Sequence, residues 1–118
     1  MTAKRERAEK AGRGGEEEAA RWLEGEGWEI IDRRRKTKLG EIDLIARREG
    51  LVAFVEVKWR RSVPDLDLAI DERRLARVAA AAGAVAHEYA SSGEDIRIDV
   101  ILLAPGAPPR HIANAWMP

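Results

Sequence analysis

The stretch GEIDLIARREGLVAFVEVKWR, residues 40–60, decides the fold. Two apolar runs, EIDLIA and LVAFVEV, flank a short charged segment, which predicts a β-hairpin. The second run is apolar on both faces of a strand, so we expect a central strand that is covered from both sides. Asp43, Glu56 and Lys58 are therefore charged residues within strands that are predicted to be buried.

The rest of the chain supplies further elements on both sides of this hairpin. We expect a short helix from Gly15 to Gly25, strands at 28–34, 41–46, 51–57 and 96–104, a loop at 61–69, a long helix at 70–90 and a last strand at 111–116. A long helix between the third and fourth strands favours a right-handed parallel crossover. The order indicates an α/β fold, a mixed sheet with helices packed on it. We expect one domain at 15–118, preceded by a flexible basic segment at 1–14.

The composition excludes several classes of protein. The 118 residues suffice for one domain, and 21 basic residues balance 21 acidic ones, which argues against a protein that coats nucleic acid by bulk charge. The absence of cysteine and the presence of only two histidines mean that carboxylates would have to hold any metal ion, which favours Mg²⁺, Mn²⁺ or Ca²⁺. The chain shows neither a signal peptide nor an apolar run near the ~20 residues of a membrane span. We expect a cytoplasmic protein without membrane association.

The three charged positions of the hairpin are predicted to share one face of the sheet. Residues two apart in a strand point the same way, so Glu56 and Lys58 lie together. With a two-residue turn at 48–49, Asp43 pairs with Phe54 and lies diagonally to Glu56, within about 7–8 Å. A three-residue turn without a bulge would instead separate the two carboxylates onto opposite faces.

Two carboxylates in a partly buried place need a cation, a shared proton or good hydrogen bonds. A hard divalent ion such as Mg²⁺ meets that need and keeps several waters when only two carboxylates hold it. One such water can be deprotonated to attack phosphorus, while the ion and a lysine stabilise the charge on the phosphate. Asp43 followed by Glu56 and Lys58 thus describes a phosphodiesterase centre. The alternative is an ordinary ion pair between Glu56 and Lys58, with Asp43 opposed to an arginine.

Several motifs of the chain resemble those of one known family. GEIDLIA and FVEVKWR in the hairpin, GEEEAARWL at 15–23, IRIDVI at 96–101 and HIANAW at 111–116 are similar, in the same order, to motifs of the YraN family. These small bacterial proteins belong to the restriction-endonuclease-like, PD-(D/E)xK superfamily. The resemblance implies a restriction-endonuclease-like αβββαβ core, with a mixed central sheet flanked by helices.

The resemblance also implies roles for residues at the matching positions. Asp43 and Glu56 would be metal ligands, the carbonyl of Val57 would complete the metal shell, and Lys58 would be the catalytic lysine. Glu16 matches a glutamate of the family and would be an outer-shell or second-metal ligand. The alternative for Glu16 is an acid that merely favours the first turn of its helix.

Basic residues flank the predicted site. We expect them to contact phosphates, which position a nucleic-acid backbone without reading its sequence; a solvated charge run is the alternative. They are Arg33, Arg34, Arg35, Lys36 and Lys38 before the hairpin, and Arg60 and Arg61 after it. The chain departs from the family at Trp59, where a small polar residue is common, and at Arg74, where a lysine is common. These departures concern substrate contacts rather than metal ligands.

Two hypotheses for the function follow. The first is a Mg²⁺- or Mn²⁺-dependent endonuclease that hydrolyses phosphodiester bonds in DNA. Branched DNA as the substrate and a homodimer as the active form are suggested by analogy with the Holliday-junction resolvases of the superfamily. The second is a non-catalytic nucleic-acid-binding or assembly protein that retains the nuclease fold. Both hypotheses, and both DNA and RNA as the bound polymer, stay open at this point.

Overall fold

The computed structural model describes residues 3–61 and 71–116, which form two helices and one five-stranded sheet. The elements are α1 (Ala3–Gly25), β1 (Glu29–Thr37), β2 (Gly40–Arg48), β3 (Leu51–Trp59), α3 (Glu72–Tyr89), β4 (Asp95–Leu103) and β5 (Arg110–Ile112). The strands lie side by side in chain order, and all neighbours are antiparallel except β3 and β4, which are parallel. This confirms the predicted α/β class, the mixed sheet and the parallel crossover through a long helix.

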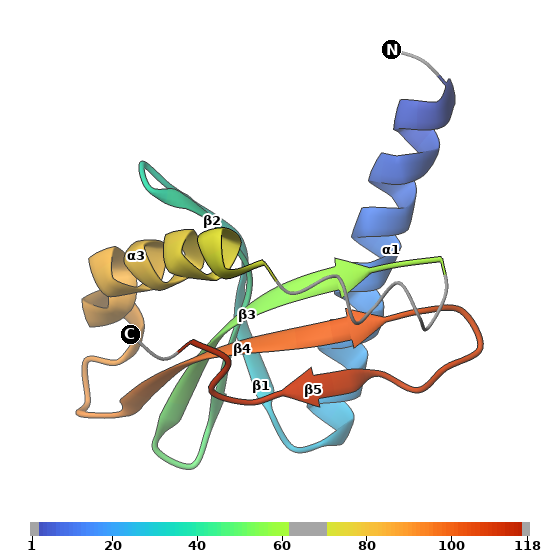
Figure 1. Cartoon of the computed structure of the whole chain (residues 1–118). Helices are drawn as coiled ribbons and strands as arrows, with labels where there is room; N and C mark the ends of the chain where they lie inside the picture. The colour runs from blue at the N-terminus through green and yellow to red at the C-terminus, as the bar shows by residue number, and fades with distance from the viewer. Residues whose placement is uncertain (1–2, 62–70, 117–118) are drawn as a thin grey trace.

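The two helices cover opposite faces of the sheet (Figure 1). On one face α1 packs Leu23 and its neighbours against Val55 and other strand residues, and Trp59 joins this cluster. On the other face α3 packs Val78 and its neighbours against Phe54. Since Phe54 and Val55 are adjacent in β3 and both fully buried, the predicted two-sided burial of this strand is confirmed. Neither helix described here is long and apolar enough to span a membrane.

The first helix is longer than the sequence indicates. We expected it from Gly15, but α1 begins at Ala3, and its first half projects beyond the sheet (Figure 1). Residues 3–14 are rich in Ala, Lys, Arg and Glu, whose high helix propensity offsets the cost of the glycines. The flexibility expected of residues 1–14 stays a prediction. The loop expected at 61–69 lies, apart from its first residue, outside the described residues.

The turn of the β2–β3 hairpin consists of Glu49 and Gly50, not of residues 48–49 as expected. Both residues have positive φ, 42° and 77°, and Arg48 pairs with Leu51 across the turn. A two-residue turn that matches the right-handed twist of a hairpin needs positive φ at both central positions. Glycine adopts this conformation without strain, so the turn forms where the glycine can take the second position.

The register of the two strands therefore shifts by two residues from the predicted one. Counted from the turn, the last pair of β2 and β3 is Leu44 with Val55. The same register, continued by one residue, places Asp43 opposite Glu56. The prediction had placed Asp43 opposite Phe54. Because a shift of two residues leaves every side chain on its face, the two carboxylates share a face as predicted and are direct rather than diagonal neighbours.

The conformation of Gly50 supplies a test of this turn. We expect Gly50→Ala to lower the free energy of unfolding by about 1 kcal/mol, because alanine is strained at a φ of 77° although its Cβ would meet no atom within 4 Å. Gly83→Ala in α3 is the matched control. Its Cβ also meets nothing within 4 Å, but the helical backbone favours alanine, so we expect a gain of about 1 kcal/mol. Urea unfolding measures both, and two changes of equal sign would contradict the turn.

Candidate functional site

The carboxylate of Asp43 lies where β2 and β3 separate. Counted from the turn, the pairing of these strands ends at Leu44 and Val55, and Asp43 is the next residue of β2. The amide N–H of Val57 donates a hydrogen bond to Asp43 Oδ2 at 2.8 Å. In a continued antiparallel ladder, this N–H would bond to the carbonyl of Ile42. The side chain of Asp43, which is 7% exposed, thus takes the place of a backbone acceptor where the pairing of the two strands ends.

Burial makes Asp43 a weaker acid. The pKa of its carboxyl is raised from an ordinary value of 3.8 to about 7, chiefly because the charged form loses hydration. The negative charges of Glu56 and Glu16 raise the pKa further, whereas the N–H of Val57 and the guanidinium of Arg74 lower it. At neutral pH the carboxyl of Asp43 is therefore more readily protonated than that of an ordinary aspartate. Glu16 lies close enough for its charge to act on Asp43, as its predicted role requires.

Glu56 is more deeply buried, and two cations contact the same one of its oxygens. Arg74 Nε lies 2.6 Å from Oε1 and Lys58 Nζ lies 3.1 Å from it, while the glutamate as a whole is 1% exposed. The other oxygen, Oε2, is buried and has no hydrogen-bond partner among residues 3–61 and 71–116. A buried carboxylate oxygen is seldom left without a partner, because nothing then compensates for its lost hydration. This free oxygen is suited to bind a cation.

Two arginines of β1 connect the sheet to the acids of α1. Arg34 Nε contacts Glu16 Oε2 at 2.8 Å, and Arg33 Nη1 contacts Glu17 Oε2 at 2.7 Å. Adjacent residues of a regular strand point to opposite faces, but Arg34 has a positive φ of 49°, which breaks the alternation. Both arginines can therefore reach α1, where they contact Glu17 and Glu16.

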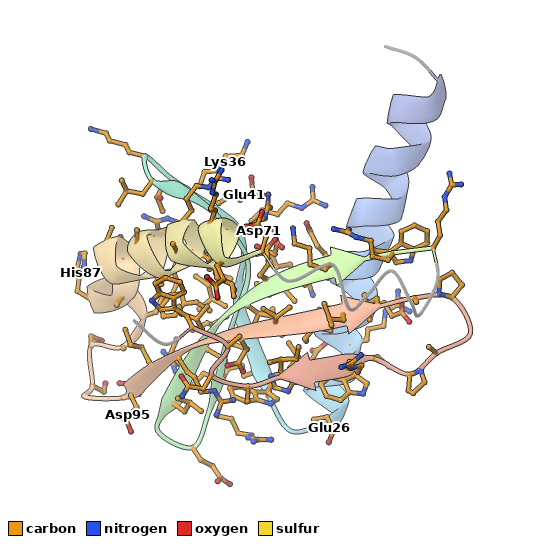
Figure 2. All side chains as sticks on the ribbon, viewed as in Figure 1. Glu26, Lys36, Glu41, Asp71, His87 and Asp95 are labelled. Carbon is orange, nitrogen blue, oxygen red and sulfur yellow. The ribbon has the colours of Figure 1, made fainter. Side chains whose placement is uncertain are left out.

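The remaining basic residues of the predicted group are more dispersed. Arg35 contacts Glu88 of α3 through two hydrogen bonds, 2.7 and 3.0 Å long, and so lies away from the site. The others are exposed or half-buried: Lys36, Lys38, Arg60 and Arg61. Lys36 is seen beside Glu41 near the start of α3 (Figure 2). The structure thus brings Arg34 to the site through Glu16, places Arg33 on the neighbouring Glu17 and leaves Arg35 out of the site.

Arg74 is the site residue that sequence reasoning missed. It lies in the first half of α3, 18 residues after Glu56, and its ion pair with that glutamate is made possible by the crossover that follows β3. The one signal in the sequence was its place off the apolar stripe of the helix, where the family commonly has a lysine. That signal gave no indication of the partner.

A second buried acid, Asp99 of β4, is fully satisfied. It is 0% exposed and accepts hydrogen bonds at 2.8 Å from Arg97 on both oxygens and at 2.9 Å from the N–H of Asn114, while His111 Nε2 lies 2.7 Å from Oδ2. Burial alone would raise the pKa of Asp99, but the bonds to His111, Arg97 and Asn114 together hold it below its ordinary value. Arg97 and Asp99 thus form an ion pair within β4, and His111 is half-buried against Asp99.

The oxygen atoms around Asp43 and Glu56 suit a hard divalent ion. Within residues 3–61 and 71–116, no group of three or more His, Cys, Asp or Glu side chains is close enough to hold a metal ion. An ion here would therefore rest on Asp43, on the free oxygen of Glu56 and on water. The carbonyl of Val57 faces the same gap, because the N–H and C=O of one strand residue point to the same neighbouring strand. Such an all-oxygen set with several waters is what Mg²⁺ prefers.

Comparison with known proteins places the chain in a family. The profile of the uncharacterised protein family UPF0102 matches residues 15–103, which contain the second half of α1, the hairpin and β4. The chain belongs to the UPF0102 family. A UPF0102 protein of Erythrobacter litoralis is 66% identical to it over 98% of this chain and 99% of the relative. UPF0102 proteins of Sphingopyxis alaskensis and Rhizorhabdus wittichii are 54% and 51% identical, and each alignment covers at least 94% of both chains. The YraN family, whose motifs this sequence resembles, is the UPF0102 family.

Proposed function

We propose that this UPF0102 protein is a metal-dependent endonuclease that hydrolyses phosphodiester bonds in DNA. The observation that carries the proposal is the free, buried oxygen of Glu56, which lies beside a second buried carboxylate and a lysine. Ionised side chains without a functional role are rare in a strand that is covered on both sides, since their desolvation opposes folding. A divalent cation bound between the two carboxylates would compensate for their desolvation and would explain why both are buried.

Each residue of the site has a proposed role. Asp43, Glu56 through Oε2 and Val57 through its carbonyl would hold Mg²⁺ or Mn²⁺. When bound, such an ion supplies a water of lowered pKa and a positive charge near the phosphate. Lys58, whose ammonium lies 3.1 Å from Glu56 Oε1, would stabilise the negative charge that develops on the phosphate. Glu16 would act as an outer ligand, which Arg34 holds in place.

The proposal extends to the substrate and its surroundings. Arg33, Arg34, Arg60 and Arg61, with Lys36 and Lys38, would contact backbone phosphates; Arg35 is left out because Glu88 holds its guanidinium. The small domain leaves little room for a separate recognition module, which favours recognition of DNA shape, such as a branch. A homodimer would present two sites to one branched substrate in the cytoplasm; this part rests on analogy with the superfamily.

A cleavage assay tests the proposal directly. The wild-type protein is incubated with Mg²⁺ or Mn²⁺ and with four-way-junction, duplex and single-stranded DNA, and with RNA. We expect metal-dependent cleavage of a DNA substrate and a loss of about 100-fold or more in Lys58→Ala, which removes the charge beside the phosphate. Arg21→Ala, an exposed arginine of α1 that is not assigned to the site or to phosphate contacts, is the control that should cleave normally. Cleavage that persists in Lys58→Ala at the wild-type rate would contradict the assigned role.

The alternative is a nucleic-acid-binding or assembly protein without turnover. One observation favours it: both Lys58 and Arg74 already contact Glu56, so the site is partly compensated without a metal ion. This alternative predicts salt-dependent DNA binding that Asp43→Ala leaves unchanged, and no cleavage with Mn²⁺.

A further inference from the structure

We propose that Arg74 is an exchangeable counter-ion. Its guanidinium neutralises Glu56 in the metal-free protein and moves to a backbone phosphate of bound nucleic acid when a divalent ion binds Glu56. The inference rests on the proposed function, because it concerns the same carboxylates, and it adds a residue that contacts the substrate. It also explains why a nuclease site holds an arginine directly on a predicted metal ligand.

The first argument is the charge balance of the site. Among the described residues, the carboxyl groups of Asp43, Glu56 and Glu16 lie near the cations Lys58, Arg74 and Arg34, and the raised pKa of Asp43 leaves this carboxyl less than fully ionised. A divalent ion would add two positive charges to a group whose cations already offset its negative charge. Like charges repel strongly where water is excluded, so either a resident cation must leave or anions must arrive. Exchange of Arg74 from a carboxylate to a phosphate achieves both.

The second argument is that Arg74 is the resident cation best able to leave. Its side chain is 46% exposed, whereas that of Lys58, which contacts the same oxygen, is 16% exposed. Arg34 is also exposed, but it contacts Glu16 and neither Asp43 nor Glu56. Arg74 holds Glu56 through Nε, and a guanidinium has further N–H donors with which to bind a phosphate. Arg74 therefore links the buried carboxylate to the surface.

The third argument is the space beside Arg74. A hollow of about 150 Å³ lies between the β1–β2 hairpin and the first turns of α3, and is lined by Gly40, Glu41, Arg74, Arg77 and Val78. Arg74 and Arg77 are three residues apart and so neighbours on the helix surface, which suits joint recognition of a phosphate. Glu41, whose charge also acts on Arg74, would oppose an anion there, and Lys36 lies opposite Glu41 across the strands. Figure 2 shows Lys36 and Glu41 at this end of α3.

Exchange of this kind couples the two ligands. Binding of the metal ion would release a phosphate-binding group, and binding of nucleic acid would draw Arg74 away from Glu56 and favour the metal ion. The coupling must be reciprocal, because both ligands act on the same equilibrium.

The test begins with Mn²⁺ titrations followed by calorimetry on the wild-type protein, Arg74→Gln and Arg73→Gln. Arg73 is an exposed arginine one position earlier on α3, so both variants lose the same charge from the same helix turn. We expect Arg74→Gln to bind Mn²⁺ about tenfold more tightly than the wild type, because no cation competes for Glu56. Arg73→Gln should bind Mn²⁺ as the wild type does.

The second measurement is the affinity for a phosphorothioate DNA duplex in the presence of Mn²⁺. Arg74→Gln should lose more of this affinity than Arg73→Gln. Wild-type-like or weaker Mn²⁺ binding by Arg74→Gln would overturn the exchange and leave the proposed function standing. Failure of the wild-type protein to bind Mn²⁺, with or without DNA, would overturn the proposed function and this inference together.

A third measurement avoids the risk that Arg74→Gln does not fold. The Nε–H resonance of Arg74 in ¹⁵N-labelled wild-type protein is identified by its absence from Arg74→Lys, which retains the positive charge. We expect this resonance to shift on addition of Mg²⁺ as the bond to Glu56 is released. A resonance that stays fixed while Mg²⁺ binds would overturn the exchange.

Discussion

Asp43→Asn is expected to make the metal-free protein more stable at pH 8, by roughly 3–5 kcal/mol. The pKa of this carboxyl is raised on folding from 3.8 to about 7, so the folded protein binds the proton more tightly than the unfolded chain. The contribution of Asp43 to stability is therefore largest at low pH and is lost as the pH rises through about 7. Asparagine avoids this loss and can still accept the N–H of Val57.

Urea unfolding at pH 5 and pH 8 checks this prediction. The gain in the free energy of unfolding should fall to less than about half at pH 5, because the wild-type carboxyl is then protonated when folded. Asp95→Asn, an exposed residue at the start of β4, is the control and should change stability little at either pH. The same Asp43→Asn variant should no longer bind Mn²⁺. A variant less stable than the wild type at pH 8 would show that the Asp43 carboxylate stabilises the fold.

Asp99→Ala is expected to have the opposite effect, a loss of about 3–5 kcal/mol in the free energy of unfolding. The substitution leaves Arg97 and His111 without the carboxylate that both contact, and removes the acceptor of the Asn114 N–H. Asp95→Ala, four residues earlier on the same strand, should change stability by no more than about 0.5 kcal/mol. A loss below about 1 kcal/mol in Asp99→Ala would mean that the cluster contributes little to the fold.

The contrast between the two buried acidic sites separates architecture from function. Asp99 has a partner on each oxygen and stabilises the fold. Asp43 has a raised pKa, and Glu56 keeps one oxygen free although two cations contact the other. A group that destabilises the folded protein and lies in a cluster of charges is a candidate for function.

The sequence predicted the parts of the fold that depend on local patterns. Two apolar runs around a charged segment identified the hairpin, and the two-residue period of a strand placed Asp43, Glu56 and Lys58 on a shared face. The apolar stripe of the long helix identified the crossover and thus the parallel pairing of β3 with β4. These features follow from the periods of strand and helix, which are properties of neighbouring residues.

Features that depend on turn geometry or on distant contacts were not predicted correctly. The register was wrong by two residues, because the glycine takes the second place of the turn and fixes which residues lie opposite. The contact of Arg74 with Glu56 and the packing of His111 against Asp99 join separate elements. The type and spacing of these residues carry no information about such partners.

The most direct test of the account is a Mn²⁺ titration by calorimetry on the wild-type protein and on the Asp43→Ala/Glu56→Ala double variant. We predict saturable binding by the wild type that is lost in the folded double variant, since both acid ligands are then absent. A titration of the protein bound to DNA covers the case in which the metal ion requires the phosphate. Equal binding by both proteins, or no binding by the wild type in either titration, would contradict the metal site at Asp43 and Glu56.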